Sequence, residues 1–121
     1  MLAAAAGSIG LFNLLKVLLD RPRPPLLGQL VAAENESLPS GHATMAVAVV
    51  GSLVALAWAA RGPAARVAMV TAAAAWAAAV GGSRVYLGVH WFSDVVAGWL
   101  VGAAWLAVCG AVWSRYRPAA S

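Results

Sequence analysis

Four long stretches of the sequence carry almost no charge, and this feature limits most strongly what the chain can fold into. A helix needs about 20 apolar residues to cross the hydrocarbon core of a bilayer. The strands of a β-barrel would instead show alternating apolar and polar residues, and that alternation is absent from the sequence. We therefore predict an all-α integral-membrane bundle of about four transmembrane helices, forming a single domain over residues 1–121. The uncharged stretches are residues 1–15, continuing to Leu19 with only Lys16 interrupting, and residues 37–60, 67–83 and 95–114.

The overall composition excludes several other classes of protein. Only 10% of the residues are charged and 63% are hydrophobic, whereas soluble domains carry about 25% charged residues. No stretch is polar enough to stay disordered in water. Cys109 is the single cysteine, so an intrachain disulfide or a cysteine-based zinc site is excluded. The first apolar stretch lacks a basic start and a polar segment with a cleavage site, so we interpret it as a helix rather than a signal peptide.

The charged residues fall into two groups when the chain crosses the membrane four times. One side receives only arginines, and cytoplasmic loops favour Lys and Arg, so we expect that side to be cytoplasmic. The linker 20–39 and the segment 81–94 then face the extracytoplasmic side, in the plasma membrane. The first side holds Arg61, Arg66, Arg115 and Arg117; the second holds Lys16, Arg21, Arg23 and Arg84 with Asp20, Glu34, Glu36 and Asp94. The net charge of +4 therefore reflects topology and site cations, and we predict no nucleic-acid partner.

The extracytoplasmic side also collects the polar residues capable of chemistry, which indicates a functional site. Three positive charges come from Lys16, Arg23 and Arg84. The planar guanidinium group of an arginine can donate two parallel hydrogen bonds to phosphate oxygens. A helix is expected to begin near Ser40 and Gly41, and the free N–H groups of a first helical turn bind anions. The Ser40 hydroxyl either caps this helix or donates to the ligand.

Two histidines complete the candidate site. His90 and Asp94 are four residues apart, so on a helical turn the carboxylate can orient the ring and leave the other nitrogen as a nucleophile. The alternative is that the pair only caps the last helix, with Ser93 as its N-cap. His42 is a metal ligand, a helix-start donor or a general acid. Metal binding is the weakest of these alternatives, because the extracytoplasmic side offers only two histidines and one well-placed acid as metal ligands. We expect metal-free phosphoryl transfer without a cofactor.

Three patterns in this order resemble the signature of the type 2 phosphatidic acid phosphatase (PAP2) superfamily. The resemblance implies that His90 is the nucleophile that forms a phosphohistidine, that Asp94 orients it and that His42 is the general acid. It also implies a metal-independent phosphate site made by Lys16, Arg23, Ser40, Gly41 and Arg84. Arg21 has no match in the signature, and we expect it at the membrane interface. The patterns are Lys-x6-Arg-Pro at residues 16–24, Pro-Ser-Gly-His at residues 39–42 and Ser-Arg-x5-His-x3-Asp at residues 83–94.

The resemblance further implies hydrolysis of a lipid phosphate or diphosphate, such as polyprenyl diphosphate, phosphatidate or phosphatidylglycerophosphate. A non-catalytic bundle that binds lipid phosphate is the alternative. Vanadate-dependent haloperoxidases share these motifs but are soluble. Membrane members of the family typically have six helices, so we expect two N-terminal helices to be missing from the bundle. A homo-oligomer is an open alternative, and Gly98-x3-Gly102 would permit close packing between helices.

Overall fold

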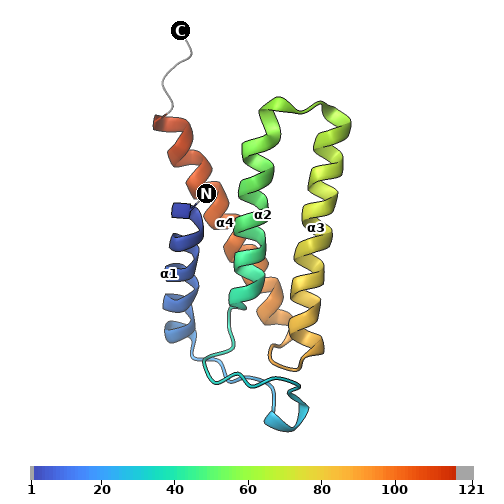
Figure 1. Ribbon diagram of the computed structural model, residues 1–121. Coiled ribbons are helices and arrows are strands. Elements are labelled where there is room, and N and C mark those ends of the chain that lie inside the picture. The colour runs from blue at the N-terminus through green and yellow to red at the C-terminus, as the bar shows by residue number, and fades with distance from the viewer. Residues whose placement is uncertain (1, 117–121) are drawn as a thin grey trace.

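The computed structural model of the protein describes residues 2–116, and it is helical throughout its regular structure (Figure 1). All four long helices have the length and hydropathy needed to cross a membrane, with mean hydropathy between 1.4 and 2.1. The prediction of a four-helix membrane bundle is therefore confirmed. The elements are α1 (Leu2–Leu19), η1 (Leu26–Gly28), α2 (Gly41–Ala57), η2 (Trp58–Ala60), α3 (Pro63–Tyr86) and α4 (Phe92–Tyr116).

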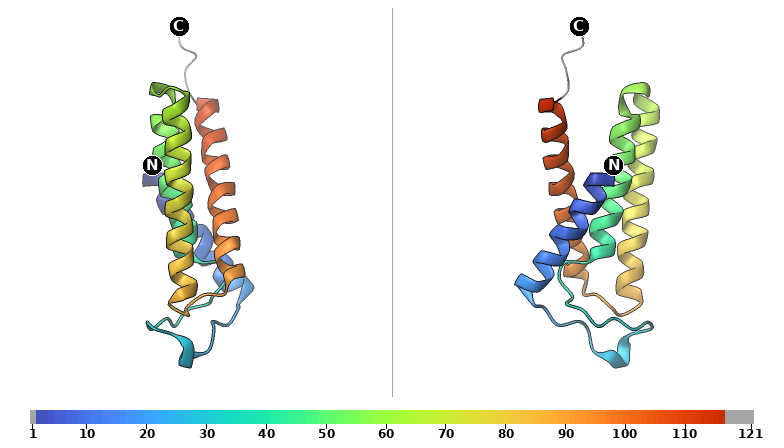
Figure 2. Two further views of the ribbon diagram at one scale, coloured as in Figure 1. Left: turned by 90° about the vertical axis from the view of Figure 1, so that its right-hand side faces the viewer. Right: turned by 60° about the vertical axis from the view of Figure 1, so that its left-hand side comes forward.

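Helix α2 lies at the centre of the bundle. It packs against α4, α3 and α1, and α4 crosses it obliquely (Figures 1 and 2). The helices alternate in direction, so α1 and α3 end at the same face of the bundle at which α2 and α4 begin. All residues of the predicted site lie at or near this face.

Small residues bring α2 and α4 into close contact. A Cβ atom added at Gly98 would lie 2.6 Å from the Ser40 carbonyl oxygen, and one at Gly102 would lie 2.7 Å from the Thr44 carbonyl oxygen. Ala43 is fully buried beneath Gly98. The glycine motif of α4 is thus occupied within the chain, and a homo-oligomer would need a different surface.

One helix boundary differs from the prediction. The segment 81–94 was expected to follow the third helix, but helix α3 continues through Gly81 and Gly82 to Tyr86. Gly81 lies inside the helix, where a Cβ would be 2.4 Å from Cγ1 of Val95, so the missing side chain lets α4 approach. Helix α2 begins at Gly41 with Ser40 as its N-cap, as predicted. The residue before a proline disfavours helical backbone, which keeps the segment before Pro39 out of this helix.

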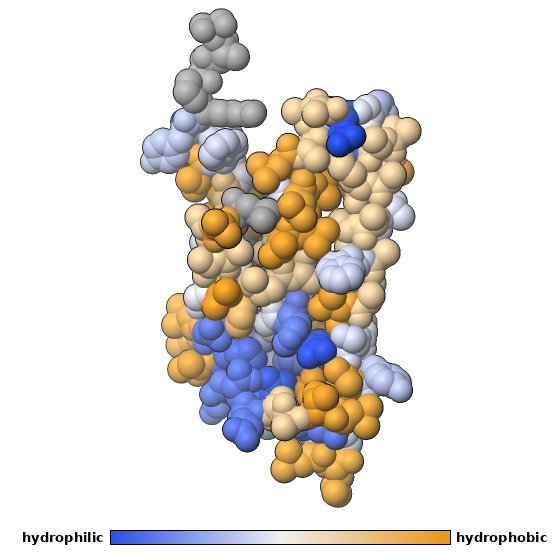
Figure 3. Space-filling model, viewed as in Figure 1, coloured by the Kyte–Doolittle hydropathy of each residue, from blue (hydrophilic) through white to orange (hydrophobic). Residues whose placement is uncertain are grey.

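The linker of residues 20–40 is bonded to the loop of residues 87–91 and to the start of α4 at the polar end of the bundle. The Leu30 N–H donates to the Leu87 carbonyl at 2.8 Å, and the Ser40 N–H donates to the Asp94 carbonyl at 3.0 Å. Gly88 has a φ of +70°, and a Cβ there would collide with the Gly28 carbonyl oxygen. Hydrophilic residues gather at this end (Figure 3).

The opposite end of the bundle carries the other arginines. Arg61 and Arg66 flank the start of α3, and Arg115 lies in the last turn of α4. Arg66 lies over the Trp58 ring at 5.0 Å. Arg117, the fourth arginine predicted for this side, is outside the described residues.

The contact between α2 and α4 gives a direct test of the fold. Gly98→Leu should lower the free energy of unfolding by about 2 kcal/mol, because overpacking a close helix contact costs about 1–3 kcal/mol. Thermal unfolding in detergent measures the effect. Gly110→Leu on the same helix is the matched control, since nothing lies within 4 Å of the position of its Cβ. Equal melting temperatures for the two variants would contradict the packing.

Candidate active site

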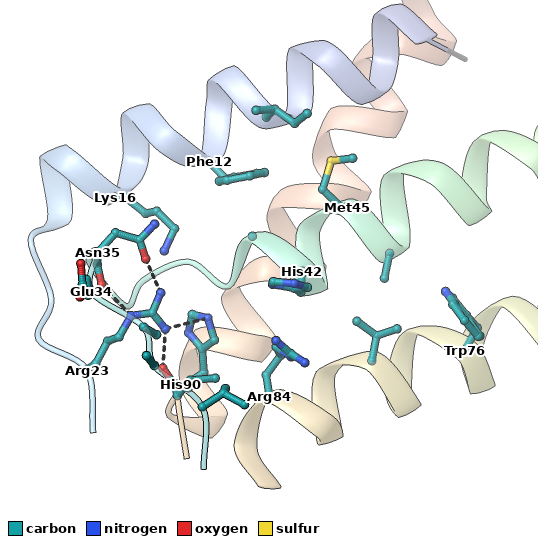
Figure 4. Close-up of a pocket in the computed structure, with 18 residues that line it drawn as sticks. Phe12, Lys16, Arg23, Glu34, Asn35, His42, Met45, Trp76, Arg84 and His90 are labelled. Atoms are coloured by element: carbon teal, nitrogen blue, oxygen red, sulfur yellow. Dashed lines mark hydrogen bonds between the residues drawn. The ribbon is translucent and has the colours of Figure 1, made fainter. Parts of the chain in front are cut away.

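A cavity of about 950 Å³ opens at the polar end, between α1, α2, α3 and the linker. It joins charged residues near the bundle end to apolar residues deeper between the helices (Figure 4). Two predicted residues, Ser40 and Asp94, are fully buried and do not line it. The predicted residues that line it are Lys16, Arg23, Gly41, His42, Arg84 and His90.

His90 lies in the loop that joins α3 to α4, and it is only 4% exposed. Its Nε2 atom is 3.2 Å from Nη1 of Arg23, so this nitrogen faces a donor and carries the lone pair. Its Nδ1 atom lies 3.4 Å from Oδ2 of Asp94, but the geometry does not make a hydrogen bond. Burial lowers the pKa of His90 to about 4; the positive charges of Arg23 and Lys16 add to the shift, and Asp94 opposes it. The ring is therefore neutral near pH 7.

Asp94 is held by donors from three parts of the chain. Its Oδ1 accepts from Nη1 of Arg21 at 3.0 Å, and its Oδ2 accepts from the Ser37 hydroxyl and, at 2.8 Å, from the Trp91 N–H. The bond from Trp91 caps α4, as an acidic side chain at the third helical position can. Asp94 thus both caps the helix and approaches His90. Ser93, considered as the N-cap, lies inside the first turn and accepts from Arg21 at 2.7 Å.

Three cations reach the cavity from different segments. Lys16, in the last turn of α1, donates through Nζ to the Glu36 carbonyl and is 4% exposed. Arg23, in the linker, donates to the backbone and side chain of Asn35, including an Nε bond of 2.6 Å. Arg84, near the end of α3, points toward His42 in Figure 4. The cavity thus collects positive charge, which suits an anion.

The start of α2 forms another wall of the cavity. The Ser40 hydroxyl accepts from the Ala43 N–H at 3.3 Å, so its role in this structure is that of an N-cap. Gly41 and His42 supply the first N–H groups of the helix, which have no acceptor within it. A Cβ at Gly41 would lie 2.9 Å from the Phe12 ring, so the absent side chain lets α1 come close.

Some functional contacts were missed by sequence reasoning. Arg21, expected at the membrane interface, pairs with the buried Asp94, a contact that was not predicted from the sequence. The one feature of the sequence that could have indicated a role for Arg21 was its position two residues before Arg23. Ser37 and Asn35, which bond Asp94 and Arg23, gave no signal, because single polar residues in a linker have no distinctive spacing.

No group of three or more His, Cys, Asp or Glu side chains that could hold a metal ion occurs within residues 2–116. Asp94, the acid beside His90, already accepts from Arg21, Ser37 and Trp91. The charged side chains that line the cavity are those of Lys16, Arg23 and Arg84 and one carboxylate, Glu34. This excess of positively charged donors fits an anionic ligand better than a cation.

Residues 1–118 match the sequence model of the PAP2 superfamily. The structure is similar to the crystal structure of a transmembrane PAP2-type phosphatidylglycerolphosphate phosphatase from Bacillus subtilis, with a TM-score of 0.86 and 27% sequence identity. The similarity covers 98% of this chain and 60% of that chain, so the present chain spans about three fifths of its length. A search of curated proteins gave no match.

The depressed basicity of His90 can be measured directly. The chain has two histidines, so His42→Gln leaves a single imidazole for NMR of the histidine-labelled protein in detergent. We expect its titration midpoint at about 4, because burial and the nearby cations disfavour the imidazolium. Adding Arg23→Gln should raise the midpoint, since a positive charge is removed. A midpoint near the ordinary value of about 6.5 would contradict the geometry described for His90.

Proposed function

The chain belongs to the PAP2 superfamily, and we propose that it hydrolyses a membrane lipid phosphate or diphosphate. The observation that carries the proposal is the cavity in which three cations meet two imidazoles at one end of a membrane bundle. The phosphatase activity named for the B. subtilis structure supports the same reaction class.

The shape of the cavity favours a lipid substrate over a soluble phosphate. From the charged end it continues between α1 and α3, along α2, to the apolar side chains of Ile9, Met45, Trp76 and Val80. A phosphate bound to the cations would leave its acyl or prenyl chain against these residues. Phosphatidylglycerophosphate, phosphatidate and polyprenyl diphosphate all have this combination of a charged head and an apolar tail.

The phosphate would be held by Lys16, Arg23 and Arg84, with the first N–H groups of α2 at Gly41 as further donors. Charge-assisted hydrogen bonds of this kind are about twice as strong as neutral ones. In the free protein Arg23 donates to the nitrogen of His90 that would attack. A bound phosphate oxygen would take this donor, which frees the His90 lone pair as the substrate arrives.

We infer a two-step reaction. Nε2 of His90 attacks phosphorus in line with the leaving oxygen, a P–N bond forms and the P–O bond to the lipid breaks. His42 donates a proton to the leaving oxygen. His42 then accepts a proton from water, which attacks the phosphohistidine, breaks the P–N bond and releases phosphate. The cations stabilise the charge on the equatorial phosphate oxygens, and Asp94 orients His90 through its Nδ1 side. No step uses a metal ion.

We further propose that the site faces the extracytoplasmic side of the plasma membrane. Arg61, Arg66 and Arg115 lie at the end opposite the cavity, and positive residues flanking short loops favour the cytoplasm. The contact of Arg66 with the Trp58 ring fits a membrane interface, where tryptophan is enriched.

Removal of the nucleophile should abolish turnover. His90→Ala is expected to lower kcat by at least about 10³-fold, as for the deletion of other catalytic nucleophiles. Phosphate release from dioctanoyl phosphatidate and from farnesyl diphosphate measures it, with Arg115→Gln at the opposite end as the control. An acid-labile, base-stable phosphoryl label should form on the wild type and be absent from the variant. Undiminished turnover in His90→Ala would overturn the assignment, and binding without turnover in the wild type would favour a non-catalytic bundle.

Metal independence gives a separate test. Hydrolysis should continue unchanged in excess chelator and should be inhibited by vanadate, which adopts the geometry of the phosphoryl-transfer transition state. Steady-state rates with and without each reagent provide the measurement. Activity that disappears in chelator and returns with a divalent ion would replace this mechanism by a metal-assisted one.

A further inference from the structure

Three consecutive linker residues each bond a different residue of the proposed site. Asn35 accepts from Arg23, the Glu36 carbonyl accepts from Lys16, and the Ser37 hydroxyl donates to Asp94. None of the three belongs to the signature patterns. The last contact is the most buried of them, because both Ser37 and Asp94 are 0% exposed.

Ser37 and Arg21 form one unit around the Asp94 carboxylate, which we name the Asp94 clamp. The Ser37 N–H donates to the Arg21 carbonyl at 2.8 Å, so the two residues that bond the Asp94 carboxylate are also bonded to each other. Arg21 binds Oδ1 of the carboxylate at 3.0 Å, and Ser37 binds Oδ2. The clamp therefore contacts both oxygens from the linker side.

The clamp restricts the orientation of the carboxylate. A carboxylate accepts at about four lone-pair positions. Two donors, the Ser37 hydroxyl and the Trp91 N–H, share Oδ2, which is also the oxygen 3.4 Å from Nδ1 of His90. Rotation of the carboxylate would break the bonds to Arg21 and Ser37 together. The plane of the carboxylate, and with it the oxygen offered to His90, is thus set by residues that lie outside the cavity.

The clamp also balances the charge of Asp94. An unpaired carboxylate with no exposure to water is costly, and removing one partner of such a buried pair is strongly destabilising. Arg21 supplies the opposite charge from a side chain that is 36% exposed. The cations on the cavity side, Arg23 and Lys16, are then left to face the substrate.

We propose that Arg21 and Ser37 are positioning residues, which hold the Asp94 carboxylate in the orientation that aligns His90 for attack on phosphorus. This inference rests on the proposed function, because it assigns the two residues to the same reaction. It concerns the chemical step and leaves the phosphate-binding cations untouched.

The test compares Ser37→Ala and Arg21→Gln with the wild type on dioctanoyl phosphatidate in detergent micelles. Each variant should lower kcat by roughly 10- to 100-fold, the usual effect of removing a group that orients a ligand or catalytic side chain. KM should stay within about twofold, and Arg21→Lys should recover part of the loss. The matched controls are Ser52→Ala, a buried serine bonded to its own helix at the Ala48 carbonyl, and Arg66→Gln at the opposite end.

A second readout does not require turnover. In the His42→Gln background, the NMR titration midpoint of His90 should rise by roughly one pH unit in each clamp variant, because the freed carboxylate interacts more strongly with the ring. In Arg21→Gln the loss of the positive charge itself raises the midpoint, so the variants that keep the charge decide. A merely structural role for Ser37 would leave the midpoint of Ser37→Ala unchanged in folded protein. If Ser37→Ala does not fold, Arg21→Lys decides, since it keeps the charge and that side chain is partly exposed.

The outcomes separate the two proposals. Wild-type kcat and an unshifted His90 midpoint in folded clamp variants would overturn the positioning role. A wild-type protein that hydrolyses none of the lipid phosphates would refute the proposed function, whereas a midpoint shift in the same protein would still support control of His90 by the clamp. A raised KM with unchanged kcat would assign the residues to binding and overturn the inference.

Discussion

The close contact between α2 and α4 is the constraint on which the rest of the structure depends. Gly98 lets the start of α4 approach the Ser40 backbone, and the Ser40 N–H bonds the Asp94 carbonyl at the same place. Two helix starts are thereby fixed side by side, one carrying His42 and the other Asp94 with the preceding His90. His42 lies in the first turn of α2 and His90 lies two residues before α4, so the two adjacent helix starts set the separation of the histidines.

The alternation of helix direction explains how so much positive charge is tolerated in one place. Lys16 and Arg84 lie in the last turns of α1 and α3, where the helix dipole is negative and stabilises cations. Asp94 lies in the first turn of α4, where an anion is stabilised. Carbonyl oxygens of the linker accept from Lys16 and Arg23. The fold therefore stabilises the separate charges before any substrate is bound.

Much of this arrangement could be predicted from the sequence, because it follows from strong local signals. Uncharged stretches identified the four spans, and the gathering of polar residues on one side, together with the resemblance to the PAP2 signature, identified six of the residues that line the cavity. The path of α3 through Gly81 could not be predicted, since it depends on packing against Val95 and Trp99 of another helix. The partnership of Arg21 and Ser37 with Asp94 likewise depends on how the linker closes in three dimensions.

The bond between the Ser37 N–H and the Arg21 carbonyl has a consequence for how such a protein can diversify. It joins the two ends of the linker, so residues 22–36 form a loop that is closed at its base. Arg23 and Asn35 lie near that base, and part of the loop between them, including Ala32 and Glu34, lines the cavity. Insertions or exchanges within residues 24–34 can thus reshape this wall of the cavity while Arg23, His42 and His90 keep their spacing, so ligand selectivity can evolve separately from the polar residues of the site.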